Sequence, residues 1–425
     1  MKEKPCGKRE KRIAERRFPV KEKKKKRQKW TRPRHRLIQH LMRPIMGPFL
    51  RLKYGLHYQK FHPTEKQYLV LANHQTAWDQ FFMGLVLYPK IMPYYVASED
   101  IFSNGFVSKL IRFLVNPIPI KKQTSDVSCV MNCMRVVREG GSIAISPEGN
   151  RTFDGRTVSM KSSIASLARA LKIPLALLRI EGGYGVEPRW GDHIRKGRID
   201  AYVSRVVSVE EIQAMSDDEL FALIEKELYV NDCASGKRFR SKKRAEHMER
   251  AFYICPECGI SEFSSKGNVT VCQRCKKAII LGEDLSLSRD GAPLPFLDTA
   301  GWYDFQKEYL LSHDTSILTE TPLHTADVEF YEIIPYKCKQ LITKKARISL
   351  FGNRYEIQFG EKTEVYSFDE IKMATVLGKK KVNFLYGETL YQIKGDVRFP
   401  CLEYMNIYYN YTRIKGGHHD GFLGI

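Results

Sequence analysis

The chain has 425 residues, of which 43% are hydrophobic and 28% charged, and its formal net charge is +22. This length allows two or three domains with an ample core. No run reaches the ~18 to 20 unbroken apolar residues that span a bilayer, which excludes a spanning helix as the expected anchor. A chain with this positive charge can bind either a nucleic acid or an anionic membrane surface, and the charge alone does not distinguish these two partners.

Most of this charge lies at the N-terminus. Residues 1–36 contain 18 Lys and Arg against 4 Glu, a net charge of +14, and lack the apolar segment of a secretory signal. We expect a disordered basic tail. Residues 37–60 mix apolar and basic side chains with Pro44 and Pro48. This pattern predicts an amphipathic segment that lies on a membrane surface, and packing on the next domain is the alternative.

Residues 61–235 alternate short apolar runs with helical patterns. We expect strands at 68–72, 94–97, 142–146, 175–180 and 198–207. A helix over 105–115 is expected to turn Phe106, Leu110, Phe113 and Leu114 inward, and Ser125-Asp126 is expected to cap a helix that runs to Arg138. This alternation predicts an α/β sandwich with a largely parallel sheet.

A histidine and an aspartate flank the end of the first buried strand. His74 follows the strand, and Asp79 falls in the first turns of the next helical pattern. Residues five apart inside a helix lie about 140° apart and do not face each other, so the junction is what lets this pair meet. Asp79 would then fix the tautomer of His74, and the other ring nitrogen would act as a general base. A capping or core role is the alternative.

A second polar motif, Pro147-Glu148-Gly149-Asn150-Arg151, follows the strand expected at 142–146. The arginine offers a forked donor to a phosphate, and the glycine permits close approach of the backbone. Ligands of α/β proteins bind beyond such strand ends. The motif therefore predicts a site for an anionic substrate, with a structural capping role for Glu148 as the alternative.

Together, Asn-His-x4-Asp and Pro-Glu-Gly-x-Arg resemble the glycerophospholipid acyltransferases, in particular the bacterial lysophosphatidate acyltransferases. Two weaker blocks keep the family's order: residues 116–122, where Lys122 replaces the usual arginine, and residues 173–178. The resemblance spans residues 37–232. It implies that His74 and Asp79 are catalytic and that Glu148 and Gly149 line the acceptor site. It also implies that Arg151 and Lys122 contact the acceptor phosphate, unless Lys122 is a solvated surface lysine.

The implied reaction is O-acyl transfer in phospholipid biosynthesis. Acyl-CoA or acyl-carrier protein would donate a fatty acyl group to the free hydroxyl of 1-acyl-sn-glycerol 3-phosphate, giving phosphatidate. We expect direct transfer without a catalytic metal or acyl-enzyme, because no Ser or Cys stands in a nucleophile elbow. Because a lysine at position 122 cannot make a bidentate contact with a phosphate, a different lysolipid is the alternative acceptor. The enzyme would work at the cytoplasmic side of the cell membrane, as a peripheral or monotopic protein.

Residues 236–284 predict a basic linker, helical over 237–250, and a small metal site. Two Cys-x2-Cys pairs, separated by 13 residues, are typical of a zinc ribbon. The expected ligands are Cys255, Cys258, Cys272 and Cys275. Two disulfides, the alternative, would suit a secreted chain. Four thiolates leave no position for water, so the zinc would be structural.

Residues 285–325 predict a connector with one amphipathic helix around Trp302. Residues 326–425 contain strand-like runs at 347–359, 365–368, 375–377, 381–386 and 389–394, followed by a helix at 400–411. This pattern resembles a pleckstrin-homology-like (PH-like) β-barrel capped by a helix. Such a domain would bind phosphoinositides or other lipid headgroups, dock a protein, or only pack against the rest of the chain. Two non-enzymatic alternatives are a nucleic-acid-binding protein and a lipid-sensing scaffold with an inactive acyltransferase domain. We do not expect the first, because it leaves the motifs of His74 and Glu148 without a purpose.

Overall fold

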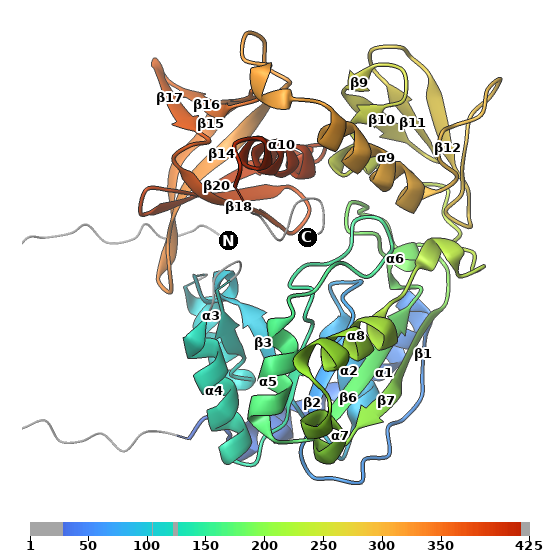
Figure 1. Cartoon of the computed structure of the whole chain (residues 1–425), viewed down its shortest axis with the longest axis vertical. Coiled ribbons are helices and arrows are strands. Elements are labelled where there is room, and N and C mark those ends of the chain that lie inside the picture. The colour runs from blue at the N-terminus through green and yellow to red at the C-terminus, as the bar shows by residue number, and fades with distance from the viewer. Residues whose placement is uncertain (1–28, 104, 122–125, 418–425) are drawn as a thin grey trace, which may run out of the picture.

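The computed structural model describes residues 29–103, 105–121 and 126–417. Figure 1 shows an α/β unit in its lower half, with two smaller units above it. The region around the four cysteines, called the ribbon region below, and helix α9 form one of these units, and an antiparallel sheet around helix α10 forms the other. In the part of the chain that is described, no helix is both long and apolar enough to cross a membrane.

The lower unit is built on a seven-stranded sheet of order β1-β7-β6-β2-β5-β3-β4. Its strands are β1 (Leu56–Tyr58), β2 (Leu69–Ala72), β3 (Tyr94–Ser98), β4 (Ile118–Ile120), β5 (Ile143–Ile145), β6 (Leu175–Glu181) and β7 (Ile199–Val207). All neighbours pair in parallel except β6 and β7, which pair antiparallel. The predicted α/β class with a largely parallel sheet is confirmed.

Helices cover both faces of this sheet. They are α1 (Pro33–Tyr54), α2 (Asp79–Leu87), α3 (Phe106–Leu114), α4 (Val127–Arg138), α5 (Ser163–Leu171), α6 (Gly183–Val186), α7 (Val209–Ala214) and α8 (Asp217–Leu228), with the 3-10 turns η1 (Glu99–Ser103) and η2 (Asp232–Ala234). Alternate residues of the central strand β2 enter two different cores. Val70 joins the core that contains α1 and α2, whereas Leu71 joins the core that contains α4, α5 and α8. Burial on both faces explains why this strand is continuously apolar.

One helix, α3, meets the solvent differently from the sequence-based expectation. Phe106 of α3 is 77% exposed, and Leu110 and Phe113 are exposed as well, so their predicted inward orientation is wrong. Periodicity locates the apolar face of a helix but not its cover, and α3 lies at the outer edge of the unit, beside η1 and the edge strand β4. Helix α1 is amphipathic, with Leu50 buried in the core and Ile45 71% exposed. It begins at Pro33, so the disordered tail expected over residues 1–36 is wrong for residues 33–36, and residues 1–28 lie outside the described residues.

The linker after residue 236 is not the predicted helix. It consists of turns and the short 3-10 turn η3 (Met248–Arg250), and it forms a β-bridge between Lys196 and Arg240. The ring of Phe239 fills a space beside Gly185 and Gly197, where a Cβ atom at either glycine would collide with it. Tertiary packing therefore replaces the local helical pattern, and the linker completes the core of the α/β unit.

The ribbon region contains short strands and one helix. They are β8 (Ile254–Cys255), β9 (Gly259–Ile260), β10 (Phe263–Lys266), β11 (Val269–Cys272), β12 (Ala278–Leu281), β13 (Leu287–Ser288) and α9 (Thr299–Ser312). The expected helix around Trp302 is present as α9. Trp302 stacks on Phe252 at 4.6 Å and on Phe296 at 5.2 Å between ring centroids, and Phe252 contacts Trp190 of the α/β unit. One aromatic cluster thus joins the two units.

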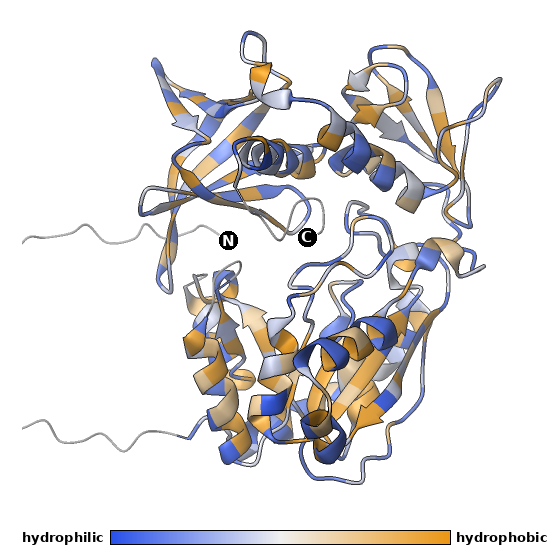
Figure 2. Cartoon of the chain, in the orientation of Figure 1, coloured by the Kyte–Doolittle hydropathy of each residue, from blue (hydrophilic) through white to orange (hydrophobic). Residues whose placement is uncertain are grey.

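The C-terminal unit is a curled antiparallel half-barrel of order β17-β16-β15-β14-β20-β19-β18, wrapped around α10 (Figure 1). After the 3-10 turn η4 (Thr315–Ile317) come β14 (His324–Ile334), β15 (Cys338–Leu350), β16 (Arg354–Phe359), β17 (Lys362–Ser367), β18 (Ile371–Leu377), β19 (Lys381–Tyr386), β20 (Thr389–Gly395) and α10 (Cys401–Ile414). Figure 2 shows that hydrophilic residues interrupt these strands more often than those of the α/β sheet. The first strand, β14, is missing from the sequence-based expectation.

Candidate active site and metal site

The end of strand β2 is fixed by the side chain of Asn73. Its Nδ2 donates to the Ile180 carbonyl at 2.8 Å, and its Oδ1 accepts from the Ile180 N–H at 2.7 Å. This amide therefore bonds to the neighbouring strand β6 as a backbone unit would. The chain leaves the sheet at the next residue, His74, and α2 begins five residues later at Asp79.

His74 and Asp79 form the pair that the sequence predicts. The Nδ1 atom of His74 lies 2.8 Å from Oδ2 of Asp79. Asp79 is buried and also accepts hydrogen bonds from the N–H groups of Gln75 and Thr76 and from the Thr76 hydroxyl, at 2.7 to 3.0 Å. With the Nδ1 proton directed at this carboxylate, the lone pair of the ring lies on Nε2. The His74 side chain is 26% exposed, so reactants can reach the ring.

Glu148 lies directly behind this pair. Its Oε1 accepts from the His74 N–H and its Oε2 from the Val158 N–H, both at 2.6 Å. Burial raises the pKa of Glu148 well above its ordinary value, against the effect of these two hydrogen bonds. The carboxyl group therefore ties the end of β2 to the loop that follows β5.

Gly149 and Arg151 follow in the same loop. Gly149 has φ 69°, in the left-handed region that favours glycine, and a Cβ atom there would meet no atom within 4 Å. Nη1 of Arg151 is buried without a hydrogen-bond partner, and burial lowers the pKa of this guanidinium. The stretch is bonded to the end of β2, because the Thr152 N–H donates to the His74 carbonyl at 3.1 Å. Lys122 lies outside the described residues.

Two site residues, Glu187 and Arg189, carry no signal in the sequence analysis. Glu187 accepts from the Ala77 N–H at 3.4 Å, and burial raises its pKa although the Arg151 charge opposes this shift. Arg189, only 2% exposed, donates to the carbonyls of Arg151, Val376 and Gly378 at 2.8 to 3.2 Å. The Arg189 guanidinium thus joins the loop that carries Glu148, Gly149 and Arg151, called the motif loop below, to the C-terminal unit. Its contacts there are at the end of β18 and in the turn that follows. Each partner is a backbone carbonyl, so no motif could reveal it.

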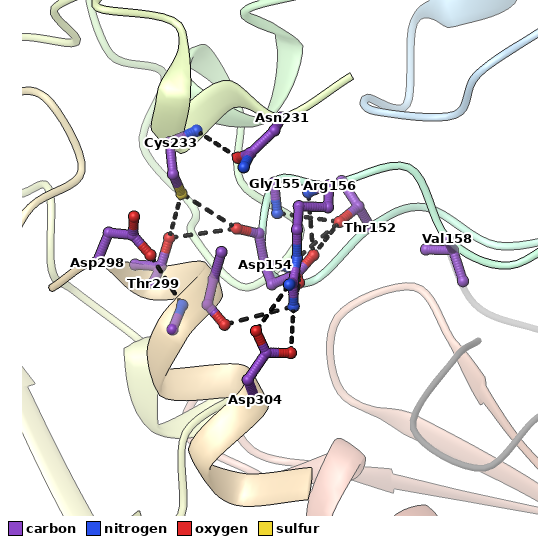
Figure 3. Close-up of polar contacts among 12 residues, drawn as sticks. Thr152, Asp154, Gly155, Arg156, Val158, Asn231, Cys233, Asp298, Thr299 and Asp304 are labelled. Carbon is purple, nitrogen blue, oxygen red and sulfur yellow. Dashed lines mark hydrogen bonds and ion pairs between the residues drawn. The ribbon is translucent and has the colours of Figure 1, made fainter. Parts of the chain in front are cut away.

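The motif loop is held on its other side by the ribbon region (Figure 3). Arg156 donates to both carboxylate oxygens of Asp304 in α9, at 2.7 and 2.8 Å, and to Asp154 of its own loop. The Asp154 carbonyl accepts from the Thr299 hydroxyl at 3.3 Å. The loop that carries Glu148, Gly149 and Arg151 is therefore clamped between two later parts of the chain.

The four predicted zinc ligands lie together. The sulfur atoms of Cys255, Cys258, Cys272 and Cys275 all lie within 4.8 Å of one another. The Cys255 and Cys275 sulfurs are 3.7 Å apart, close to the ~3.8 Å edge of a tetrahedron with Zn–S bonds of about 2.3 Å. Four thiols at this spacing fit a metal ion, and zinc bound by four thiolates has no open position for a substrate.

Part of the lower unit is similar to known acyltransferases. Residues 54–180 match the family model described as Acyltransferase. The chain is 22% identical over 165 residues to a 1-acyl-sn-glycerol-3-phosphate acyltransferase of Streptococcus pneumoniae, which covers 37% of this chain and 59% of that protein. A protein of the same description from Bacillus subtilis is 21% identical over 120 residues, or 28% of this chain and 58% of its own length.

The chain spans less than three fifths of the length of these relatives. The crystal structure of the 1-acyl-sn-glycerophosphate (LPA) acyltransferase PlsC from Thermotoga maritima matches 46% of this chain and 91% of its own, with 18% identity and a TM-score of 0.35. The family model and the relatives support the acyltransferase superfamily for this chain.

Proposed function

We propose that the chain is a membrane-surface O-acyltransferase that converts 1-acyl-sn-glycerol 3-phosphate to phosphatidate. One observation carries the proposal: the His74–Asp79 hydrogen bond of 2.8 Å at the carboxyl end of a central parallel strand. The acyltransferase match over residues 54–180 and the names of the relatives support the reaction class. The acyl donor is a thioester, either acyl-CoA or acyl-carrier protein.

In this mechanism His74 is the general base. Its Nε2 takes the proton of the acceptor hydroxyl, and the hydroxyl oxygen forms a bond to the thioester carbonyl carbon. The carbon–sulfur bond breaks, and the imidazolium returns its proton to the departing sulfur. The products are an ester and a free thiol. Asp79 holds the ring and stabilises the imidazolium.

Arg151, together with Lys122, is proposed to bind the acceptor phosphate. The unpartnered Nη1 of Arg151 supports this role, because a buried donor without a partner is costly and a phosphate would satisfy it. Glu148 is assigned as a positioning residue because the N–H groups of His74 and Val158 occupy its two oxygens. Gly149 leaves space for the acceptor. Since Lys122 stands in place of an arginine, a lysolipid with another headgroup is the second candidate acceptor.

The remaining parts complete the proposal. Residues 1–36 form a basic tail, 37–60 a membrane-surface segment, 61–235 the acyltransferase domain, 236–284 the linker and zinc ribbon, 285–325 a connector and 326–425 a PH-like domain. The four cysteines would hold a structural zinc ion. The exposed Leu41 and Ile45 of α1 support attachment to one side of a membrane.

The test is a transfer assay on the purified chain with labelled acyl thioester and a panel of lysolipids. We expect lysophosphatidate to be the preferred acceptor. His74→Ala should lower the rate about 10² to 10⁴-fold, and Asp79→Asn somewhat less, because the imidazole remains. His57→Ala, a change at an exposed histidine of β1, is the matched control. Wild-type activity in His74→Ala would refute the mechanism.

A further inference from the structure

A cavity of about 420 Å³ lies between the acyltransferase domain and the C-terminal unit. Figure 1 shows the β14–β15 hairpin extending down to η1 and α3. The lining comprises aromatic and basic side chains: Phe102, Phe106, Lys109, Arg112, Tyr336 and Lys337. Its volume falls in the range of small-ligand sites. None of these residues belongs to the candidate active site.

The tip of the hairpin is fixed in place on the acyltransferase domain. The N–H of Tyr336 donates to the Ser103 hydroxyl at 3.1 Å, and Tyr336 adopts φ 60°, which is uncommon for a residue other than glycine. The rings of Tyr336 and Phe102 lie 6.3 Å apart between centroids. Because both units supply its walls, the cavity exists only in the assembled chain.

Three cations from the two units surround the cavity. The guanidinium of Arg112 lies over the Phe102 ring at 4.8 Å and over the Tyr336 ring at 5.7 Å. Stacking of this kind fixes the guanidinium plane and leaves its N–H edge available to an oxyanion. Lys109 and Lys337 carry the other two charges. Within residues 29–103, 105–121 and 126–417, none of the three side chains has a carboxylate within 4 Å.

An exposed apolar surface adjoins these cations. Phe106, Leu110 and Phe113 of α3 are 77%, 43% and 54% exposed, and Figure 2 shows hydrophobic residues along this helix. Arg34 of α1 lies over the Phe113 ring at 4.1 Å, which joins this surface to the exposed residues of α1. Basic side chains beside an apolar helical face are typical of helices that lie in a membrane interface.

The three cations and the exposed apolar residues of α3 together limit which ligand the cavity can bind. The chain's own N-terminal tail carries a charge of +14, so the three cations repel it. An acidic peptide would satisfy the cations but would leave Phe106 and Leu110 in water. A phospholipid with an anionic headgroup satisfies both, because its phosphate meets the cations and its acyl chains cover the apolar face.

We infer that this cavity binds the headgroup of an anionic bilayer phospholipid, with Lys109, Arg112 and Lys337 around the phosphate and α3 inserted among the acyl chains. The inference rests on the proposed function only in placing the chain at a membrane. The C-terminal unit thereby takes part in orienting the acyltransferase domain on the bilayer. Because the site is separate from His74, occupation does not require transfer chemistry.

The test compares the full-length chain with the triple variant Lys109→Gln, Arg112→Gln, Lys337→Gln in vesicle sedimentation near 0.15 M salt, close to physiological ionic strength. The vesicles contain phosphatidylcholine alone or with phosphatidylglycerol. Each basic side chain at an anionic surface is worth roughly fivefold in binding, so we expect at least about tenfold weaker binding to the anionic vesicles and unchanged binding to the neutral ones. Lys226→Gln, Lys242→Gln, Lys307→Gln loses the same charge at exposed positions elsewhere and is the control.

A second variant, Phe106→Ser with Leu110→Ser, should weaken binding to both kinds of vesicle, and added salt should not change this loss. Transfer to a water-soluble, short-chain lysophosphatidate, measured without vesicles, should be unchanged in both variants. Equal sedimentation of the triple variant and its control would overturn the inference. A raised KM for the soluble acceptor would also overturn it, since the site would then belong to the acceptor. Absence of transfer in the parent chain would refute the proposed function and leave the vesicle result standing.

Discussion

Replacement of Glu148 by glutamine distinguishes a role in positioning His74 from a role in binding the acceptor directly. The Glu148 carboxyl accepts from the N–H groups of His74 and Val158, each at 2.6 Å. Glutamine keeps one acceptor oxygen and turns an NH₂ group toward the other N–H. One hydrogen bond is lost and a buried donor is left unsatisfied, which costs about 1 to 3 kcal/mol. For a domain of this size, that change lowers Tm by roughly 2 to 4 °C per kcal/mol.

The kinetic consequence follows from the position of His74. If the end of β2 moves, the base no longer meets the acceptor hydroxyl, so kcat should fall while KM for the acceptor stays near its original value. Steady-state transfer assays and thermal unfolding measure the two effects. Glu65→Gln, at an exposed position in the turn before β2, should change neither. A raised KM with unchanged kcat would refute the positioning role and favour direct binding of the acceptor.

Three further outcomes are expected. Elemental analysis should find one zinc per chain, and Cys255→Ser should lower Tm far more than turnover at low temperature; metal-free protein with four reduced cysteines would contradict the ribbon. Leu41→Ser with Ile45→Ser, both exposed in α1, should remove the salt-resistant part of vesicle binding without lowering Tm, and unaltered sedimentation in high salt would exclude the α1 anchor. Burial raises the pKa of Asp232 to about 6, so its contribution to stability is full below pH ~3.8 and is lost as pH rises through 6. Chemical unfolding across this range should show that decline in the parent but not in Asp232→Asn, and identical pH profiles would contradict the assignment.

Sequence-based prediction succeeded where the cause is local. The apolar run of β2 and the helical pattern after it locate His74 at a junction, and the His74–Asp79 hydrogen bond follows from that placement. The four predicted cysteines lie together, with all sulfur atoms within 4.8 Å of one another, because each Cys-x2-Cys turn already holds its two thiols close in sequence. Asp126 at the start of α4 accepts from the Cys129 N–H at 3.1 Å, as a helix cap does.

Sequence-based prediction failed where a structural feature depends on residues that are distant in the sequence. The strand β14 alternates weakly because most of its side chains are half-exposed, and it is held in the sheet by backbone pairing with β15 and β20, which are distant in sequence. Arg189 bonds to carbonyls more than 180 residues later, which no local pattern encodes. The orientation of α3 depends on what lies beside it, and an amphipathic pattern is the same whether water, protein or lipid faces its apolar side.

The position of Phe239 has a consequence for the order in which the protein matures. The ring fills a space between Gly185 and Gly197 in the acyltransferase domain, yet it belongs to the segment that leads out of that domain. A ribosome that has released the sheet and its helices has therefore not yet released the side chain that closes their core. Domains generally fold as units during synthesis. The core of this domain, however, would stay incomplete until the linker that carries Phe239 leaves the ribosome. A gene cut at the end of the last helix of the sheet would lack that residue, and its product would expose the unfilled space to proteases and chaperones.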